Sequence, residues 1–173
     1  GREGGLLPYP YGLALDGRGN LLIADRDAGR ILAVAEKDRS VTGTLAVESP
    51  MLVAADGGTG AVYVLRSSGQ KGAIELAKYR AWNDAKPVAV LPANVGSTTA
   101  KPLIALDAAA RPPVLWFGTY YSLLRIEDQG DRFGPPKPVG KGKSGPLRRL
   151  GFEDLVVDHY RPEPEVYSRL EGG

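Results

Sequence analysis

The chain has 173 residues, of which 43% are hydrophobic and 24% charged, and its formal net charge is +2. This balance is typical of a folded globular protein, because a disordered chain carries fewer apolar residues and a larger net charge. There is no cysteine, which excludes disulfide bonds, thiolate metal sites and a nucleophilic thiol. No apolar run approaches the roughly 20 residues of a membrane-spanning helix, so we expect no membrane span.

Residues 10–47 form the first predicted unit. An apolar run over residues 12–15 ends at Asp16, and the turn sequence of residues 17–20, Gly-Arg-Gly-Asn, follows it. Glycine and asparagine tolerate the positive φ that a tight hairpin requires. Further strands are expected at residues 21–24, 30–34 and 41–47. Four antiparallel strands in about 40 residues predict one blade of a β-propeller.

The same order of strands and turns recurs along the chain. We expect a second blade at residues 50–92, a third at 102–139 and part of a fourth at 152–170, all within one propeller domain over residues 1–173. The first strand of each unit ends in an aspartate, in order Asp16, Asp56, Asp107 and Asp158. We predict that these aspartates are structural, because a carboxylate at a strand end accepts backbone N–H bonds in the turn.

These patterns predict an all-β fold, a β-propeller segment of about three four-stranded blades and the start of a fourth, in an incomplete ring. The first strands are apolar almost throughout, which predicts that both of their faces are covered. A parallel α/β fold would also give apolar strands. That fold needs helical crossovers, however, and the intervening segments lack a helical apolar period.

Residues 10–35 resemble the NHL repeat, a unit of propellers that usually have six blades. The resemblance is carried by Pro10-Tyr11-Gly12-Leu13-Ala14-Leu15-Asp16, by Gly19-Asn20-Leu21-Leu22-Ile23-Ala24-Asp25 and by Arg30-Ile31. It implies an NHL-like propeller that serves as a ligand-binding, protein-binding or scaffolding module. The sequence does not fix a compartment, although a secreted or periplasmic location is slightly favoured.

An incomplete ring needs further blades, because open strand edges are templates for pairing that native proteins cover. We expect these blades in cis, from a longer polypeptide, or in trans, from another chain. The last strand pair stops within a blade, which favours a fragment of a longer polypeptide. The partner of the completed module would be a protein or a small molecule.

Ligand-binding residues are expected at the starts of innermost strands, near the mouth of the central channel. Four side chains occupy such positions, namely Tyr9, Tyr11, Glu153 and Asp154. Only the two carboxylates can bind a hard cation or act as acid or base, and one pair from one blade is insufficient. We therefore predict no metal site, no evident cofactor and no catalytic residues within this chain.

The alternative is a propeller enzyme whose other site residues lie outside the chain. Resemblance to gluconolactonase-type propellers implies a divalent cation, such as calcium, held by several blades of the complete ring. Resemblance to the NHL-type lyases of amidated-peptide biosynthesis implies zinc held by several histidines, but this chain has only His159.

A basic segment supplies a third hypothesis, nucleic-acid binding. Residues 134–152 carry five basic side chains and no acidic one, in order Lys137, Lys141, Lys143, Arg148 and Arg149. Certain NHL propellers bind single-stranded RNA on a basic face. Stacking aromatic residues are missing between residues 134 and 151, so we predict a solvated loop and do not expect a nucleic-acid partner.

Overall fold

The computed structural model describes residues 11–68, 73–82, 84–93, 102–118 and 123–139, together with the backbone of residues 152–158 and 165–170. Every element in these ranges is a β-strand. None of the described residues forms a helix that is long and apolar enough to cross a bilayer. The chain divides into two compact units, Gly1–Ala93 and Asn94–Gly173.

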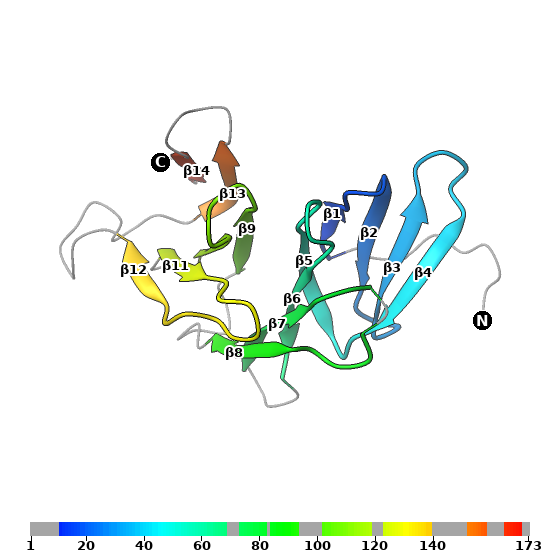
Figure 1. Cartoon of the computed structure of the whole chain (residues 1–173), viewed down its shortest axis with the longest axis horizontal. Helices are drawn as coiled ribbons and strands as arrows, with labels where there is room; N and C mark the ends of the chain where they lie inside the picture. The colour runs from blue at the N-terminus through cyan, green and yellow to red at the C-terminus, as the bar shows by residue number, and fades with distance from the viewer. Residues whose placement is uncertain are drawn as a thin grey trace. The chain divides into compact units, whose positions relative to one another are not determined.

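The first sheet consists of β1 (Leu13–Leu15), β2 (Asn20–Asp25), β3 (Arg30–Ala35) and β4 (Val41–Ala46), antiparallel and in chain order (Figure 1). The hairpin between β1 and β2 turns at Gly19, whose φ of 79° is a left-handed conformation that glycine adopts without steric cost. The turn chemistry of the sequence therefore sets this hairpin.

The second sheet follows the same order with β5 (Pro50–Ala55), β6 (Val62–Ser67), β7 (Ile74–Tyr79) and β8 (Ala89–Ala93). It packs against the first sheet through one apolar core. The first sheet contributes Leu22, Ala24, Ile31, Ala33, Leu45 and Val47 to this core, and the second sheet contributes Val53, Val62, Val64, Ala77 and Tyr79.

Two glycines allow the strands β1 and β5 to approach closely. A Cβ added to Gly12 would lie 2.8 Å from the Cα of Leu52, and one added to Gly17 would lie 2.2 Å from the carbonyl oxygen of Gly57. Both contacts are with backbone, which cannot rotate away as a side chain can. Glycine is therefore required at both ends of β1 for the two sheets to pack.

Strand β1 differs from expectation in its burial. The side chains of Leu13 and Leu15 are 57% and 66% exposed, whereas Ala14 between them packs against the core. Within this chain, therefore, one face of β1 is not covered as predicted. An apolar run shows that a strand avoids water, but it does not show which neighbour covers each face.

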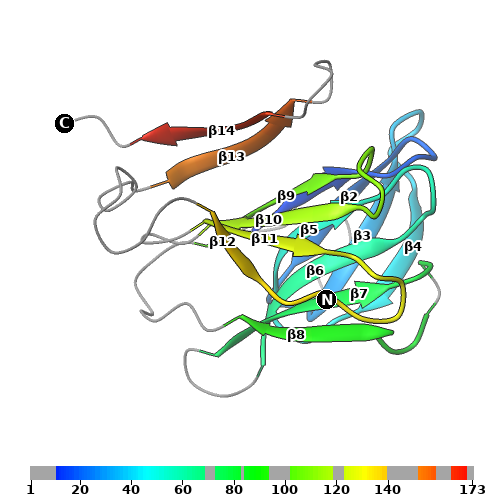
Figure 2. The ribbon, with the colours of Figure 1, turned by 60° about the vertical axis from the view of Figure 1, so that its left-hand side comes forward.

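The second unit contains the third sheet, formed by β9 (Leu103–Asp107), β10 (Val114–Gly118), β11 (Leu123–Glu127) and β12 (Lys137–Val139). The strands β13 (Phe152–Asp158) and β14 (Glu165–Leu170) pair with each other, and β13 contacts β9 (Figure 2). Each sheet is antiparallel and follows chain order, which is the arrangement of propeller blades.

Neighbouring aromatic residues of β10 face opposite ways, as strand alternation requires. Trp116 packs with Leu123, Leu103, Ala105 and Val139 on one face of the third sheet. Phe117 is 2% exposed and is not part of that cluster. Both rings serve packing, so they do not form a shared carbohydrate-stacking surface.

Candidate functional site

A cleft of about 750 Å³ lies in the first unit where two hairpin turns meet. It is lined by the turn between β1 and β2, by the turn between β5 and β6, by residues 80–82 after β7, and by Ala33 and Thr42. We call this feature the turn cleft. Clefts of this size hold small molecules or the side chains of a bound peptide.

The acidic group on the first wall is held within its own turn. One oxygen of Asp16 accepts the backbone N–H groups of Arg18 and Asn20, both at 2.8 Å. The other oxygen accepts the side-chain amide of Asn20 at 2.7 Å, and the amide oxygen of Asn20 accepts the hydroxyl of Thr42 at 2.9 Å. This network joins the turn to β4 and fixes the shape of the wall.

These contacts also shift the titration of Asp16. Burial acts to raise its pKa, but the hydrogen bonds from Asn20 and from the backbone of Arg18 together outweigh burial, so the pKa lies below its ordinary value. Asp16 is therefore ionised at neutral pH. The positive charge of Arg18 in the same turn also lowers this pKa.

The second wall repeats this chemistry. One oxygen of Asp56 accepts the N–H of Gly58 at 2.9 Å, and the other accepts the hydroxyl of Thr59 at 2.7 Å. Asp107 accepts the N–H groups of Ala109 and Ala110 in the third sheet. The prediction that the blade aspartates stabilise turns is confirmed for these three residues, whereas the side chain of Asp158 lies outside the described residues.

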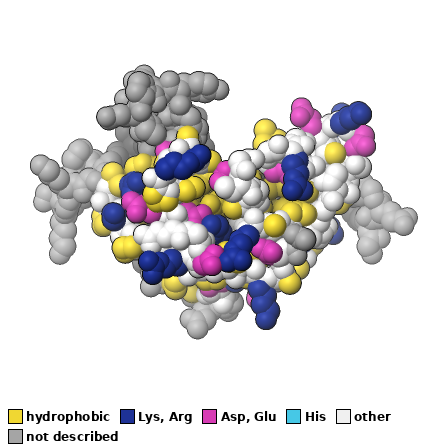
Figure 3. Space-filling model, viewed as in Figure 1, with side chains coloured by type: hydrophobic (Ala, Val, Ile, Leu, Met, Phe, Trp, Pro, Cys, Tyr) yellow, Lys and Arg dark blue, Asp and Glu magenta, His cyan; other side chains and the backbone are white. Residues whose placement is uncertain are grey.

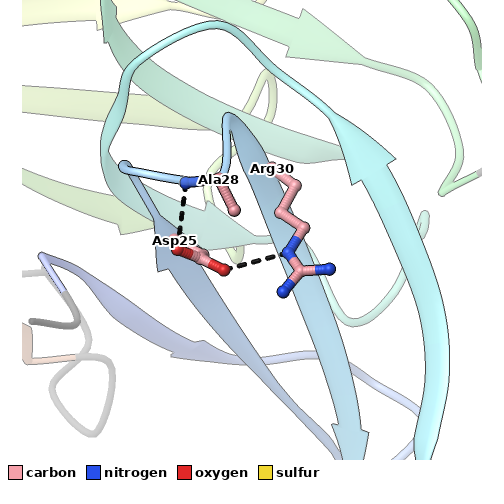
Figure 4. A network of polar contacts seen from close by, with 3 residues as sticks. All are labelled: Asp25, Ala28 and Arg30. Atoms are coloured by element: carbon pink, nitrogen blue, oxygen red, sulfur yellow. Dashed lines mark hydrogen bonds and ion pairs between the residues drawn. The ribbon is translucent and has the colours of Figure 1, made fainter. Parts of the chain in front are cut away.

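A related carboxylate stabilises the opposite end of the first sheet. Asp25, at the end of β2, accepts the guanidinium Nε of Arg30 at 2.9 Å and the N–H of Ala28 at 3.3 Å (Figure 4). The second sheet has the reversed pair at its corresponding end, where Arg66 donates to Glu75 at 2.7 Å. In each pair the two residues are directly opposite each other in the ladder, so the ion pair joins neighbouring strands of one sheet.

The aromatic wall of the turn cleft is Trp82. Its indole ring lies over Gly43 of β4, where an added Cβ would be 1.9 Å from Nε1. Within the described residues Nε1 has no hydrogen-bond partner. The ring can occupy this position because residue 43 has no side chain.

Two cationic side chains also line the turn cleft. Arg18 and Arg80 are both exposed and both line it. Among the described residues, no group of three or more His, Cys, Asp or Glu side chains could hold a metal ion.

Sequence reasoning did not single out Arg18, Arg80 or Trp82. Arg18 stood within a predicted hairpin turn, and Trp82 follows a strand without any motif around it. The only signal was the rarity of tryptophan, of which the chain has two. The packing of two sheets brings these residues together.

Tyr11 is the predicted ligand-binding residue whose side chain the structure describes. It is 47% exposed, and the guanidinium of Arg26 lies 5.0 Å from its ring centroid. It precedes β1, whereas the turn cleft lies beyond the end of that strand, so Tyr11 is not part of the cleft. Tyr9 and His159 lie outside the described residues.

Glu153 and Asp154 are placed by their backbone only. Both lie within β13, and Asp154 is opposite Arg169 in the ladder with β14. The sequence reading put them just before the strand. Their side chains lie outside the described residues, so their role as ligand-binding residues stays a prediction.

Of the five basic residues in this segment, the structure describes only Lys137. Lys137 begins β12, opposite Arg125, and its Nζ lies 3.5 Å from a carboxylate oxygen of Glu127. A hydrogen bond from Arg125 and the charge of Lys137 lower the pKa of Glu127. The other basic residues, Lys141, Lys143, Arg148 and Arg149, lie outside the described residues. Side chains of both charge signs are intermingled on the face shown in Figure 3.

The comparisons with known proteins support the fold. No protein-family model matches the chain, and no curated protein matches it. Solved structures do match. The chain is similar to a glucose dehydrogenase, with 17% identity and a TM-score of 0.59 over 92% of this chain and 57% of that one.

Two further solved structures are similar at comparable levels. The allergen Mala s 1 of Malassezia sympodialis has 15% identity and a TM-score of 0.60, over 93% of this chain and 50% of that one. Streptogramin B lyase has 10% identity and a TM-score of 0.52, over 85% of this chain and 44% of that one. The chain thus spans about half the length of these proteins.

Glucose dehydrogenase and streptogramin B lyase are β-propeller proteins. This chain is a β-propeller segment. The predicted fold class, three four-stranded blades and the start of a fourth in an incomplete ring, is confirmed. At these identities the likeness concerns the fold alone, because one fold carries many activities.

Proposed function

We propose that the chain belongs to an NHL-like β-propeller that works as a binding module, and that the turn cleft holds part of its ligand. The observation that carries this proposal is the division of roles within the cleft. The carboxylates accept hydrogen bonds from their own turns, and two guanidinium groups and an indole line the same cleft. A site of this kind binds a ligand and supplies no general base.

The chemistry of the walls defines the ligand class. Guanidinium groups bind carboxylates and phosphates through charge-assisted hydrogen bonds, and an indole offers a flat apolar face. We infer a small molecule or peptide side chain that combines an acidic group with a flat apolar group. The acidic group would contact Arg18 and Arg80, and the flat group would lie on Trp82.

Tryptophan fluorescence tests this proposal directly. In a Trp116→Phe chain, Trp82 is the sole tryptophan and reports on the cleft. The probes are aromatic carboxylic acids and their neutral amides. We expect the acids to change the Trp82 emission at saturable concentrations, and Arg18→Gln to weaken their binding about tenfold.

The matched control is Lys37→Gln, which removes one exposed positive charge outside the cleft. This change should leave binding within about twofold, because Lys37 does not line the cleft and would make no direct contact with the ligand. Equal responses to acids and amides, or equal weakening by Arg18→Gln and Lys37→Gln, would contradict the proposed site.

A further inference from the structure

The first sheet has an apolar face on the side away from the second sheet. Between β1 and β2, Leu13 is opposite Ile23 and Leu15 is opposite Leu21. Between β2 and β3, Ile23 is opposite Leu32 and Leu21 is opposite Val34. We call these six side chains the front face. Leu13 and Leu15 are more than half exposed, whereas Leu32 is 7% exposed and the other three side chains are partly buried.

The second sheet shows what such a face is for. Asp16 and Asp56 begin equivalent turns in the two sheets. The ladder pair next to the turn is Leu15 with Leu21 in the first sheet and Ala55 with Val62 in the second, so these two pairs are equivalent. Continuing along both ladders matches each further residue of the front face with one of the second sheet: Leu13 with Val53, Ile23 with Val64, Leu32 with Ala77 and Val34 with Tyr79. These four residues of the second sheet are at most 5% exposed.

These four residues of the second sheet are buried against the other face of the first sheet, which we call its back face. Leu22, Ala24 and Ile31 belong to the same core cluster and are fully buried there. A blade interface in this chain therefore joins the front face of one sheet to a back face of small and branched apolar side chains. The front face of the first sheet has the same position and character as a surface that a blade already covers.

Charge does not oppose burial of the front face. Asp25 and Arg30 are the charged residues that continue it along β2 and β3, and they neutralise each other at 2.9 Å. When an ion pair at the edge of an interface is covered, each charge keeps its partner, so no charge is left uncompensated. An exposed apolar patch of this kind marks an interaction surface.

We propose that a second copy of this chain docks on the front face, with one of its own sheets packed there as the first sheet packs on the second. This proposal takes the second alternative of the sequence analysis, blades supplied in trans, and the ring length supports a second copy as the occupant. Streptogramin B lyase and glucose dehydrogenase are propellers of which this chain covers 44% and 57%, so two copies supply about the length of one such ring. This docking does not depend on the proposed ligand of the turn cleft.

Sedimentation equilibrium of the 173-residue chain tests the docking. We expect a species of twice 18.4 kDa to form with increasing concentration, between about 1 μM and about 100 μM. The double variant Leu13→Lys/Leu15→Lys should weaken association at least about 100-fold, because docking would bury two unpaired charges. Both side chains are largely exposed within one chain, so the variant should keep the thermal stability of the unsubstituted chain.

The matched control is Val90→Lys, at an apolar residue of β8 that is 43% exposed and lies outside the front face. It should leave the dissociation constant within about threefold, since its charge stays in water. A chain of 18.4 kDa at every concentration would overturn the proposal. So would a dimer that the Leu13/Leu15 variant does not weaken, or one that Val90→Lys weakens equally.

Discussion

Replacing Gly43 by alanine should displace the indole of Trp82 and open the turn cleft. The three atoms nearest to an added Cβ all belong to this ring, at 1.9 Å from Nε1, 2.7 Å from Cδ1 and 2.9 Å from Cε2. Because non-bonded atoms need about 3.5 Å, the ring would have to move by roughly 1.5 Å. Overpacking of this kind costs about 1–3 kcal/mol of unfolding free energy.

A double-mutant cycle separates this clash from other effects of the substitution. In a Trp82→Ala background the obstructing atoms are gone, and Gly43→Ala should be neutral or stabilising by up to about 1 kcal/mol, because glycine weakens a strand interior. The expected coupling between the two sites is therefore about 1–3 kcal/mol. Urea unfolding of the four chains measures it.

The emission of Trp82 gives an independent measurement. In the Trp116→Phe background, Gly43→Ala should shift the emission to longer wavelength, because a displaced indole is more exposed to water. The reasoning is refuted if Gly43→Ala destabilises the chain equally with and without Trp82. An unchanged emission spectrum would also show that the ring does not rest on Gly43.

Three further predictions concern the turns and the paired charges. Asp56→Ala should lower the unfolding free energy by about 1–3 kcal/mol, since it leaves turn N–H groups without their acceptor, whereas Ala substitution of the exposed Asp27 should change it by less than about 0.5 kcal/mol in the same urea titration. Because the folded pKa of Asp16 lies below its ordinary value of 3.8, its carboxylate stabilises the fold fully above that pH and loses this effect as the pH falls through the folded pKa. The difference in unfolding free energy between the unsubstituted chain and Asp16→Asn should thus shrink on acidification, and a constant difference would contradict the shift. The double change Arg66→Glu/Glu75→Arg should recover most of the stability lost in either single change, because Asp25 and Arg30 already form the reversed pair in the first sheet; thermal unfolding of the three variants decides this.

Local chemistry made most of the fold predictable. The turn after Asp16 needs a residue that tolerates positive φ, and Gly19 supplies it, so the hairpin is readable from a few adjacent residues. The turns after Asp56 and Asp107 use the same carboxylate contacts. Information that lies within five or six consecutive residues was therefore enough to place the strands.

The turn cleft could not be predicted in this way, because its parts are distant in the chain. Trp82 meets Gly43 only after β7 has paired with β6 and the second sheet has packed on the first. The sequence around Trp82 contains no pattern that predicts this contact. The exposure of Leu13 and Leu15 was missed for a similar reason, since burial of a strand depends on which sheet lies beside it.

The two proposals use different parts of the repeat. A cleft that binds a ligand can differ from blade to blade at its exposed side chains, because residues such as Arg18 and Arg80 do not belong to the core between the sheets. The front faces cannot vary as freely, since Val64 and Ala77 of the second sheet are fully buried and their equivalents Ile23 and Leu32 have the same apolar character. Packing between blades therefore conserves the chemistry of the faces and leaves the turns to acquire specificity. For this reason a substitution at Leu13 should alter assembly without altering the cleft, and a substitution at Arg18 should do the reverse.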